Sequence, residues 1–184
     1  MKPLFALFWQ ICRFRRGPED VPFAPALAGL LVVAVAALVG ASVVVLGSLA
    51  PSPPSDTPVV PPATQLLVQW LALAAWLAAI FILLRFKNLT ARYAQTLIAA
   101  LGTDLIMFVP QFAGFALLAA NPPESAIAGV GQVTVLFIYI WDMLIKGHIY
   151  SRALNISRLQ GNLLSLALSY GIFAISALLI PLPR

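Results

Sequence analysis

Charged residues are scarce in this sequence. Asp, Glu, Lys and Arg make up 9% of its 184 residues, whereas a soluble domain carries about 25%. Hydrophobic residues make up 61%, so a water-soluble fold would lack the polar side chains to cover its surface. A disordered chain is excluded for the opposite reason, because such chains are poor in hydrophobic residues. We therefore predict that lipid surrounds most of the chain.

Cysteine and histidine each occur once, which limits the chemistry that the chain can perform. Cys12 alone can form no disulfide within the chain, and His148 alone argues against a zinc or di-iron site. The sequence has no glycine-rich phosphate loop, and the serines of the last apolar run have no histidine at their depth. We expect no cofactor, no metal and no enzymatic activity.

Five apolar runs are each long enough to cross a bilayer core of about 30 Å, at about 1.5 Å per helical residue. They are residues 26–49, 64–84, 94–120, 126–145 and 162–181. The sequence thus predicts an all-α, polytopic membrane helix bundle, with one five-span transmembrane domain over residues 26–184. Six prolines within residues 50–63 predict an extended connector between the first two spans.

Residues 1–25 are predicted to lie at the membrane surface, ahead of the first span. A helix over residues 1–17 would place five apolar side chains at helical spacing, with basic residues towards the other side. The five are Leu4, Phe5, Phe8, Trp9 and Cys12. Three prolines in residues 18–25 then predict a loop that leads into the first span. The N-terminal segment is therefore expected to be an interfacial amphipathic helix followed by a loop.

The basic residues are distributed unevenly between the two sides of the predicted membrane. Ten of the 11 Lys and Arg precede the first span or follow the second and fourth, and Arg184 lies on the other side. Short basic clusters between apolar runs are topology signals, and they argue against a nucleic-acid partner. The positive-inside rule predicts a cytoplasmic N-terminus and a C-terminus on the other side. The composition, rich in Ala, Leu and Val, resembles that of a bacterial inner-membrane protein, so we expect a multi-pass protein of the cell inner membrane with a periplasmic C-terminus.

The third span carries a carboxylate, Asp104, close to mid-membrane. An Asp there costs about 2.5–3.5 kcal/mol on insertion scales, which makes it a candidate functional residue. Gln111 lies on the same helical face, and Pro110 removes a backbone hydrogen bond, which predicts a kink. Because no Lys or Arg of another span lies at the predicted depth, we expect no ion pair. The candidate partners of Asp104 are Thr134, Tyr139, Ser169 and Tyr170.

A second set of polar residues lies at the end of the fourth predicted span. Asp142 lies about one turn from the predicted inner end, and Lys146 follows at i+4, a spacing that allows an ion pair near the headgroups. With His148 and nearby aromatic residues, this group suits membrane anchoring or a docking surface for a partner or an anionic lipid. Asp142 is predicted to lie too far from Asp104 in depth to form an acid/base pair with it. Residues 147–161 would form an interfacial helix or extend the fifth span.

The five-span layout, with the segment RGPEDVPFAP ahead of the first span, resembles bacterial members of the Yip (Ypt/Rab-interacting protein) domain membrane family. That family has a cytoplasmic N-terminus and five clustered spans. The resemblance covers most of the chain at the level of architecture, and it transfers no functional residue. It implies a non-enzymatic role in organising membrane or protein partners.

Two functions remain open from the sequence alone. The first is a scaffold or accessory subunit that contacts the bilayer and binds a membrane-protein partner or a second copy of the chain. The alternative is a small transporter or channel-like subunit with a proton or cation pathway through Asp104. A neutral Asp104 that only joins helices by hydrogen bonds would fit the first function. A polar cavity that reaches Asp104 would favour the second.

Overall fold

The computed structural model describes residues 2–49 and 60–179, and all the regular secondary structure in them is helical. The helices are α1 (Lys2–Cys12), α2 (Pro25–Leu49), α3 (Pro62–Phe86), α4 (Tyr93–Ala120), α5 (Ala126–Ala153) and α6 (Arg158–Leu179). Two short 3-10 turns, η1 (Pro18–Asp20) and η2 (Thr90–Arg92), precede α2 and α4. The five helices α2 to α6 are long and apolar enough to cross a membrane. The predicted all-α, five-span membrane bundle is therefore confirmed.

Several helix ends differ from the predicted boundaries. α5 continues eight residues past 145, and α6 begins at Arg158, so residues 147–161 form no separate interfacial helix. α1 stops at Cys12 rather than near residue 17. Most of the predicted proline-rich connector, 50–59, and the C-terminal residues 180–184 with Arg184 lie outside the described residues.

Left-handed backbone conformations explain where α3 and α5 stop. Asn88 and Asn155 have φ angles of 57° and 53°, and Asn tolerates this region better than most residues. The amide of the following residue then donates to a carbonyl five residues earlier, from Leu89 to Leu84 at 2.7 Å. The same bond joins the Ile156 amide to the Ser151 carbonyl at 3.0 Å. These bonds satisfy carbonyl groups that a helix end leaves free, so both helices end there.

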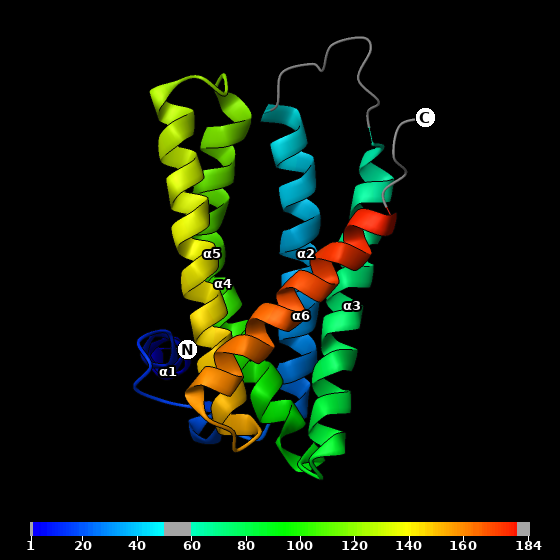
Figure 1. Ribbon diagram of the computed structural model, residues 1–184, viewed down its shortest axis with the longest axis vertical. Helices are drawn as coiled ribbons and strands as arrows, with labels where there is room; N and C mark the ends of the chain where they lie inside the picture. The colour runs from blue at the N-terminus through cyan, green and yellow to red at the C-terminus, as the bar shows by residue number, and fades with distance from the viewer. Residues whose placement is uncertain (1, 50–59, 180–184) are drawn as a thin grey trace.

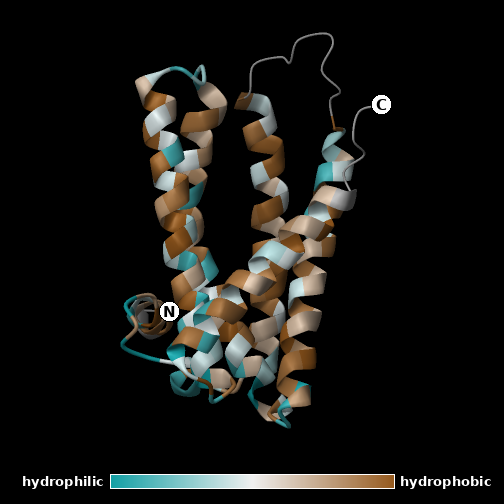
Figure 2. Ribbon diagram, viewed as in Figure 1, coloured by the Kyte–Doolittle hydropathy of each residue, from teal (hydrophilic) through white to brown (hydrophobic). Residues whose placement is uncertain are grey.

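One end of the bundle carries most of the polar residues. α1, η1, the α3–α4 turn and the α5–α6 turn all lie at this end, which we call the basic end (Figure 1). Figure 2 shows hydrophilic residues gathered there, while apolar residues cover most of the long helices. Toward the opposite end, the antiparallel pair α4–α5 diverges from α2, α3 and α6 (Figure 1).

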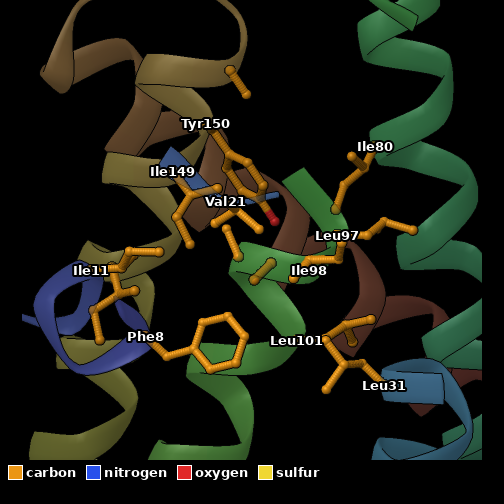
Figure 3. Close-up of a cluster of buried hydrophobic side chains, with 14 of the residues drawn as sticks. Phe8, Ile11, Val21, Leu31, Ile80, Leu97, Ile98, Leu101, Ile149 and Tyr150 are labelled. Atoms are coloured by element: carbon orange, nitrogen blue, oxygen red, sulfur yellow. The ribbon is translucent and has the colours of Figure 1, made fainter. Parts of the chain in front are cut away.

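The basic end also contains the apolar core. Figure 3 shows buried apolar side chains from different helices converging there, including Ile11 of α1, Leu101 of α4 and Ile149 of α5. Phe8 of α1 packs against Gly102 of α4, where a Cβ atom would overlap the phenylalanine ring. Helices α1 to α5 therefore pack together through buried apolar side chains at this end.

The predicted apolar face of α1 is divided between two environments. Phe8 and Cys12 are buried against the bundle, whereas the side chains of Phe5 and Trp9 are 62% and 47% exposed. The bundle therefore covers only part of the predicted apolar face, because α1 packs on α4 and α5 through one side. A position of the outer side at the membrane surface stays a prediction.

α5 and α6 make their closest approach at a pair of glycines near the basic end. A Cβ atom on Gly161 would collide with the carbonyl oxygen of Gly147, which is backbone and cannot rotate away. A Cβ on Gly147 would collide with Asn162 in the same way. The two glycines therefore allow the helices to pack in close contact.

We predict that Gly161→Ala lowers the free energy of unfolding by about 1–3 kcal/mol, the usual cost of overpacking. The matched control is Gly171→Ala on the same helix, where a Cβ would meet nothing within 4 Å. Both changes raise helix propensity equally, so the difference between them isolates the contact. Thermal unfolding in mild detergent measures it, and equal stability of the two variants would contradict the described α5–α6 packing.

Candidate functional site

Three charged side chains from α4 and α5 meet in the interior of the bundle. The Lys146 Nζ lies 2.8 Å from Asp142 Oδ2 and 3.1 Å from Asp104 Oδ1. We call these three residues the charge cluster. The expectation that Asp104 forms no ion pair was wrong, since Lys146 is within direct contact distance of both carboxylates.

The lengths of α4 and α5 explain why these residues meet. The ends of the two helices lie level, because Arg92, just ahead of α4, donates to the carbonyls of Arg152 and Ala153 at the end of α5. Asp104 lies 11 residues after the first residue of α4, and Asp142 lies 11 residues before the last residue of α5. Each is thus about 16 Å from this end along its helix. The predicted difference in depth between them was wrong, because α5 continues to Ala153, eight residues past the predicted end of the fourth span.

Two aromatic side chains connect the charge cluster to α3. The Trp76 Nε1 of α3 donates a buried hydrogen bond to the Tyr150 hydroxyl of α5 at 2.9 Å. The Lys146 ammonium lies 5.6 Å from the centroid of the Trp76 ring, which is a cation–π distance. One oxygen of Asp142, Oδ1, is buried and has no hydrogen-bond partner within the described residues. It is therefore available to accept a bond from a ligand or a proton.

A cavity of about 630 Å³ opens onto the charge cluster from between α2, α3, α4, α5 and α6. All three charged residues line it. Its uncharged polar lining is formed by Gln69, Gln111, Tyr139, Ser169 and Ser176. Its apolar lining includes Leu38, Val68, Trp76, Phe108, Ile172 and Phe173. The site is thus a mostly apolar chamber with a charged group at the level of Asp104.

The predicted partners of Asp104 divide into two groups. Tyr139 and Ser169 line the same cavity as Asp104. Thr134 instead donates to the Val130 carbonyl of its own helix, and Tyr170 is 68% exposed, so these two assignments were wrong. Gln111 lines the cavity, as its place on the Asp104 face implies, and Pro110 lies inside the continuous helix α4.

His148 and Tyr150 hold the N-terminal segment and α3 rather than anchoring the protein in the headgroups. Both side chains are buried. The His148 Nε2 lies 2.9 Å from the Arg16 carbonyl oxygen, so this nitrogen carries the proton and donates. The Trp141 Nε1 donates to the Cys12 carbonyl at 3.2 Å. The anchoring interpretation was wrong for His148 and Tyr150, because α5 carries them into the packed core.

A second, polar cavity of about 470 Å³ lies at the surface of the basic end. It is lined by Glu19, Arg92, Gln95, Arg152 and Asn155, among others. Glu19 pairs with Arg152 at 3.2 Å on the exposed surface. Nearby, the Gly17 amide and the Arg16 guanidinium bind the Asp20 carboxylate and lower its pKa. The Glu19–Arg152 pair fastens the segment after α1 to the end of α5, while the contacts of Asp20 hold the segment itself together.

Comparison of the chain with models of protein families, with curated proteins and with solved structures gave no match. The resemblance to Yip domain proteins therefore stays a prediction. The site is assigned from its geometry alone.

The chemistry open to the charge cluster is the binding of a proton or a cation. Within residues 2–49 and 60–179, no group of three or more His, Cys, Asp or Glu side chains could hold a metal ion. The sequence alone does not connect Lys146 with Asp104, and it points neither to Trp76 nor to the buried role of Tyr150. The helix-ending Asn155 was the available signal, because it lengthens α5 and so carries Asp142 and Lys146 to the depth of Asp104.

The lone thiol, Cys12, offers a direct test of how α1 packs. Burial, together with the nearby Asp142 and Asp104 carboxylates, raises the pKa of Cys12 to about 12. The thiolate is the reactive form, so a raised pKa slows alkylation at pH 8. We predict that maleimide modifies the folded protein more than about tenfold more slowly than the unfolded protein.

The same measurement has an internal control. Phe8→Ala removes the ring that lies between α1 and α4, and should speed the modification of Cys12 in the folded protein. Mass spectrometry of quenched samples follows the reaction. Equal rates for the folded and unfolded chains would contradict the docked position of α1.

Proposed function

We propose that the protein is a small transporter-type membrane protein whose pathway is the central cavity. A proton or another monovalent cation would bind at the charge cluster and couple to the movement of the cargo. The observation that carries this proposal is the cavity of about 630 Å³ that reaches Asp104. An Asp that merely joins helices would have no need of such a space.

The cost of the charge cluster supports a functional role. Ionisable residues within membrane spans are expensive, and they commonly mark substrate or proton pathways. Here three of them lie together on α4 and α5. A buried ion pair is weak evidence for stability, since well-packed apolar residues stabilise a core as well or better. The cluster is therefore better explained by binding than by folding.

The orientation follows from the placement of the basic residues. Apart from Lys146 of the charge cluster, every Lys and Arg of the described residues belongs to α1, the segment after it, the α3–α4 turn or the adjoining ends of the long helices. By the positive-inside rule, the basic end would face the cytoplasm of a cell whose inner membrane holds the protein. The cavity would then lie in the outer half of the membrane, with the charge cluster at its cytoplasmic side.

The second candidate function is a scaffold or accessory subunit of the kind that the Yip resemblance implies. It is favoured by α1, which is docked by one side and exposes Phe5 and Trp9 on the other. These aromatic residues and the arginine-lined cavity at the basic end would suit an anionic lipid or a protein partner. This function requires no pathway through the bundle.

Proton movement in proteoliposomes distinguishes the two functions. Purified protein is reconstituted into vesicles that contain a pH indicator, and gradients of Na⁺, K⁺ or tetraphenylphosphonium are imposed in turn. We predict that at least one gradient changes the internal pH in the presence of the wild-type protein. Asp104→Asn should reduce the rate about tenfold or more, because the coupling carboxylate is lost.

The control variant is Asp20→Asn, which alters a carboxylate on the surface outside both the cavity and the charge cluster. It should transport at the wild-type rate. The transporter proposal would be contradicted if, under all three gradients, the internal pH changed no faster than in protein-free vesicles. The scaffold function would then remain.

A further inference from the structure

The charges of the cluster do not cancel. Two carboxylates face one ammonium, and no other Asp, Glu, Lys or Arg of the described residues lines the cavity. The remaining titratable groups near the cluster are Tyr139 on the cavity wall, Tyr150 beside Lys146, and Cys12 of α1. Phenols and thiols are uncharged in their usual form at neutral pH, so these side chains add no charge to the count. One negative charge is therefore left over at a depth where an unpaired charge is strongly disfavoured.

Only two kinds of particle can neutralise that charge within the cavity. One is a proton shared by Asp104 and Asp142. The Oδ1 atom of Asp142 is buried and has no hydrogen-bond partner within the described residues, so it can take up this proton. The other is a monovalent cation that occupies the space beside them. Because both bind the same carboxylates, they exclude each other.

The size and lining of the cavity decide which cation fits. Its volume of about 630 Å³ is within the range of about 300–1,000 Å³ that holds drug-sized molecules. A bare inorganic cation would lose its water shell and would need several oxygen ligands in exchange. The wall above the charge cluster supplies few, since its uncharged polar residues are Gln69, Gln111, Tyr139, Ser169 and Ser176 among many apolar ones.

Aromatic side chains on the wall are suited to an organic cation. Trp76, Phe108 and Phe173 line the cavity from three different helices, and aromatic faces attract cations that have given up water. The Lys146 ammonium already makes this contact, at 5.6 Å from the Trp76 ring centroid. The side chain of Lys146 is itself an alkylammonium ion, so the site already stabilises one organic cation.

We infer that the cavity binds an amphiphilic organic monocation, with its positive group beside Asp104 and Asp142 in place of a proton. Its apolar body lies against α2, α3 and α6. This inference rests on the proposed function and names the substrate class of the same site. Lys146 sets the specificity for a single charge, because without it the carboxylates would leave two negative charges to neutralise.

Calorimetric titration of the purified wild-type protein tests this directly. The probes are tetraphenylphosphonium and tetraphenylborate, which share their shape and differ in the sign of their charge. The cation should bind about tenfold or more tightly than the anion. Its affinity should rise with pH, by up to about tenfold per unit, over the range in which the cluster loses its proton.

Proton release gives a second readout that needs no variant. Titrations in buffers of different ionisation enthalpy should show about one proton released for each cation bound, at a pH where the free cluster is protonated. Asp104→Asn should weaken cation binding about tenfold or more, while Asp20→Asn leaves it unchanged. Lys146→Gln should shift the preference about tenfold toward a dication whose two charges lie close together, such as hexamethylethylenediammonium.

The possible failures are distinguishable. Equal binding of the phosphonium and the borate, or cation binding without proton release at any pH, would overturn the inference. If a Na⁺ or K⁺ gradient drives proton movement but the phosphonium does not bind, the transporter proposal stands and its substrate class is wrong. If the phosphonium binds with proton release but no gradient moves protons, the substrate class stands and transport is wrong.

Discussion

The contact on which the rest of the structure depends is the Lys146 ammonium between the carboxylates of Asp104 and Asp142. It joins α4 to α5 at the middle of both helices, and Trp76 extends the join to α3. In hydrocarbon, each of these charges is tolerable only because the others are within contact distance. The alignment of the helices must therefore bring all three to one depth, and the turns at the basic end maintain that alignment.

The bundle is packed at the basic end, and a cavity opens between its helices beyond the charge cluster. Apolar side chains, the docked α1 and the Gly147–Gly161 contact hold the helices together at the basic end. Beyond the charge cluster, α4 and α5 lean away from the other three helices (Figure 1). The cavity occupies this divergence, with the ionisable residues of the charge cluster at its floor and mostly apolar side chains on its walls. Such a chamber is suited to an amphiphile and poorly suited to a hydrated ion.

Composition was sufficient to predict the fold class, because length and hydropathy alone identify a helix that can cross a bilayer. The site was harder, since its geometry depends on helix ends. Residues 146–153 look polar enough for a loop, yet they continue α5, because Ile149 and Tyr150 are buried by neighbouring helices. Because the predicted end of α5 was eight residues too early, the predicted depth of Asp142 was wrong by about 12 Å. The contact of Lys146 with Asp104 could therefore not be predicted. The cavity could not be predicted, because it results from the relative tilt of helices that are far apart in sequence.

The most direct test of the central contact is a double-mutant cycle between Asp104 and Lys146. The free energy of unfolding is measured in detergent for the wild type, Asp104→Asn, Lys146→Met and the double variant. The structure predicts a coupling energy of about 1–3 kcal/mol, because Lys146→Met alone leaves both carboxylates without their cation, and adding Asp104→Asn removes one of those unpaired charges. Effects of the single variants that add to within about 0.5 kcal/mol would show that the two side chains do not interact, and the charge cluster would have to be abandoned.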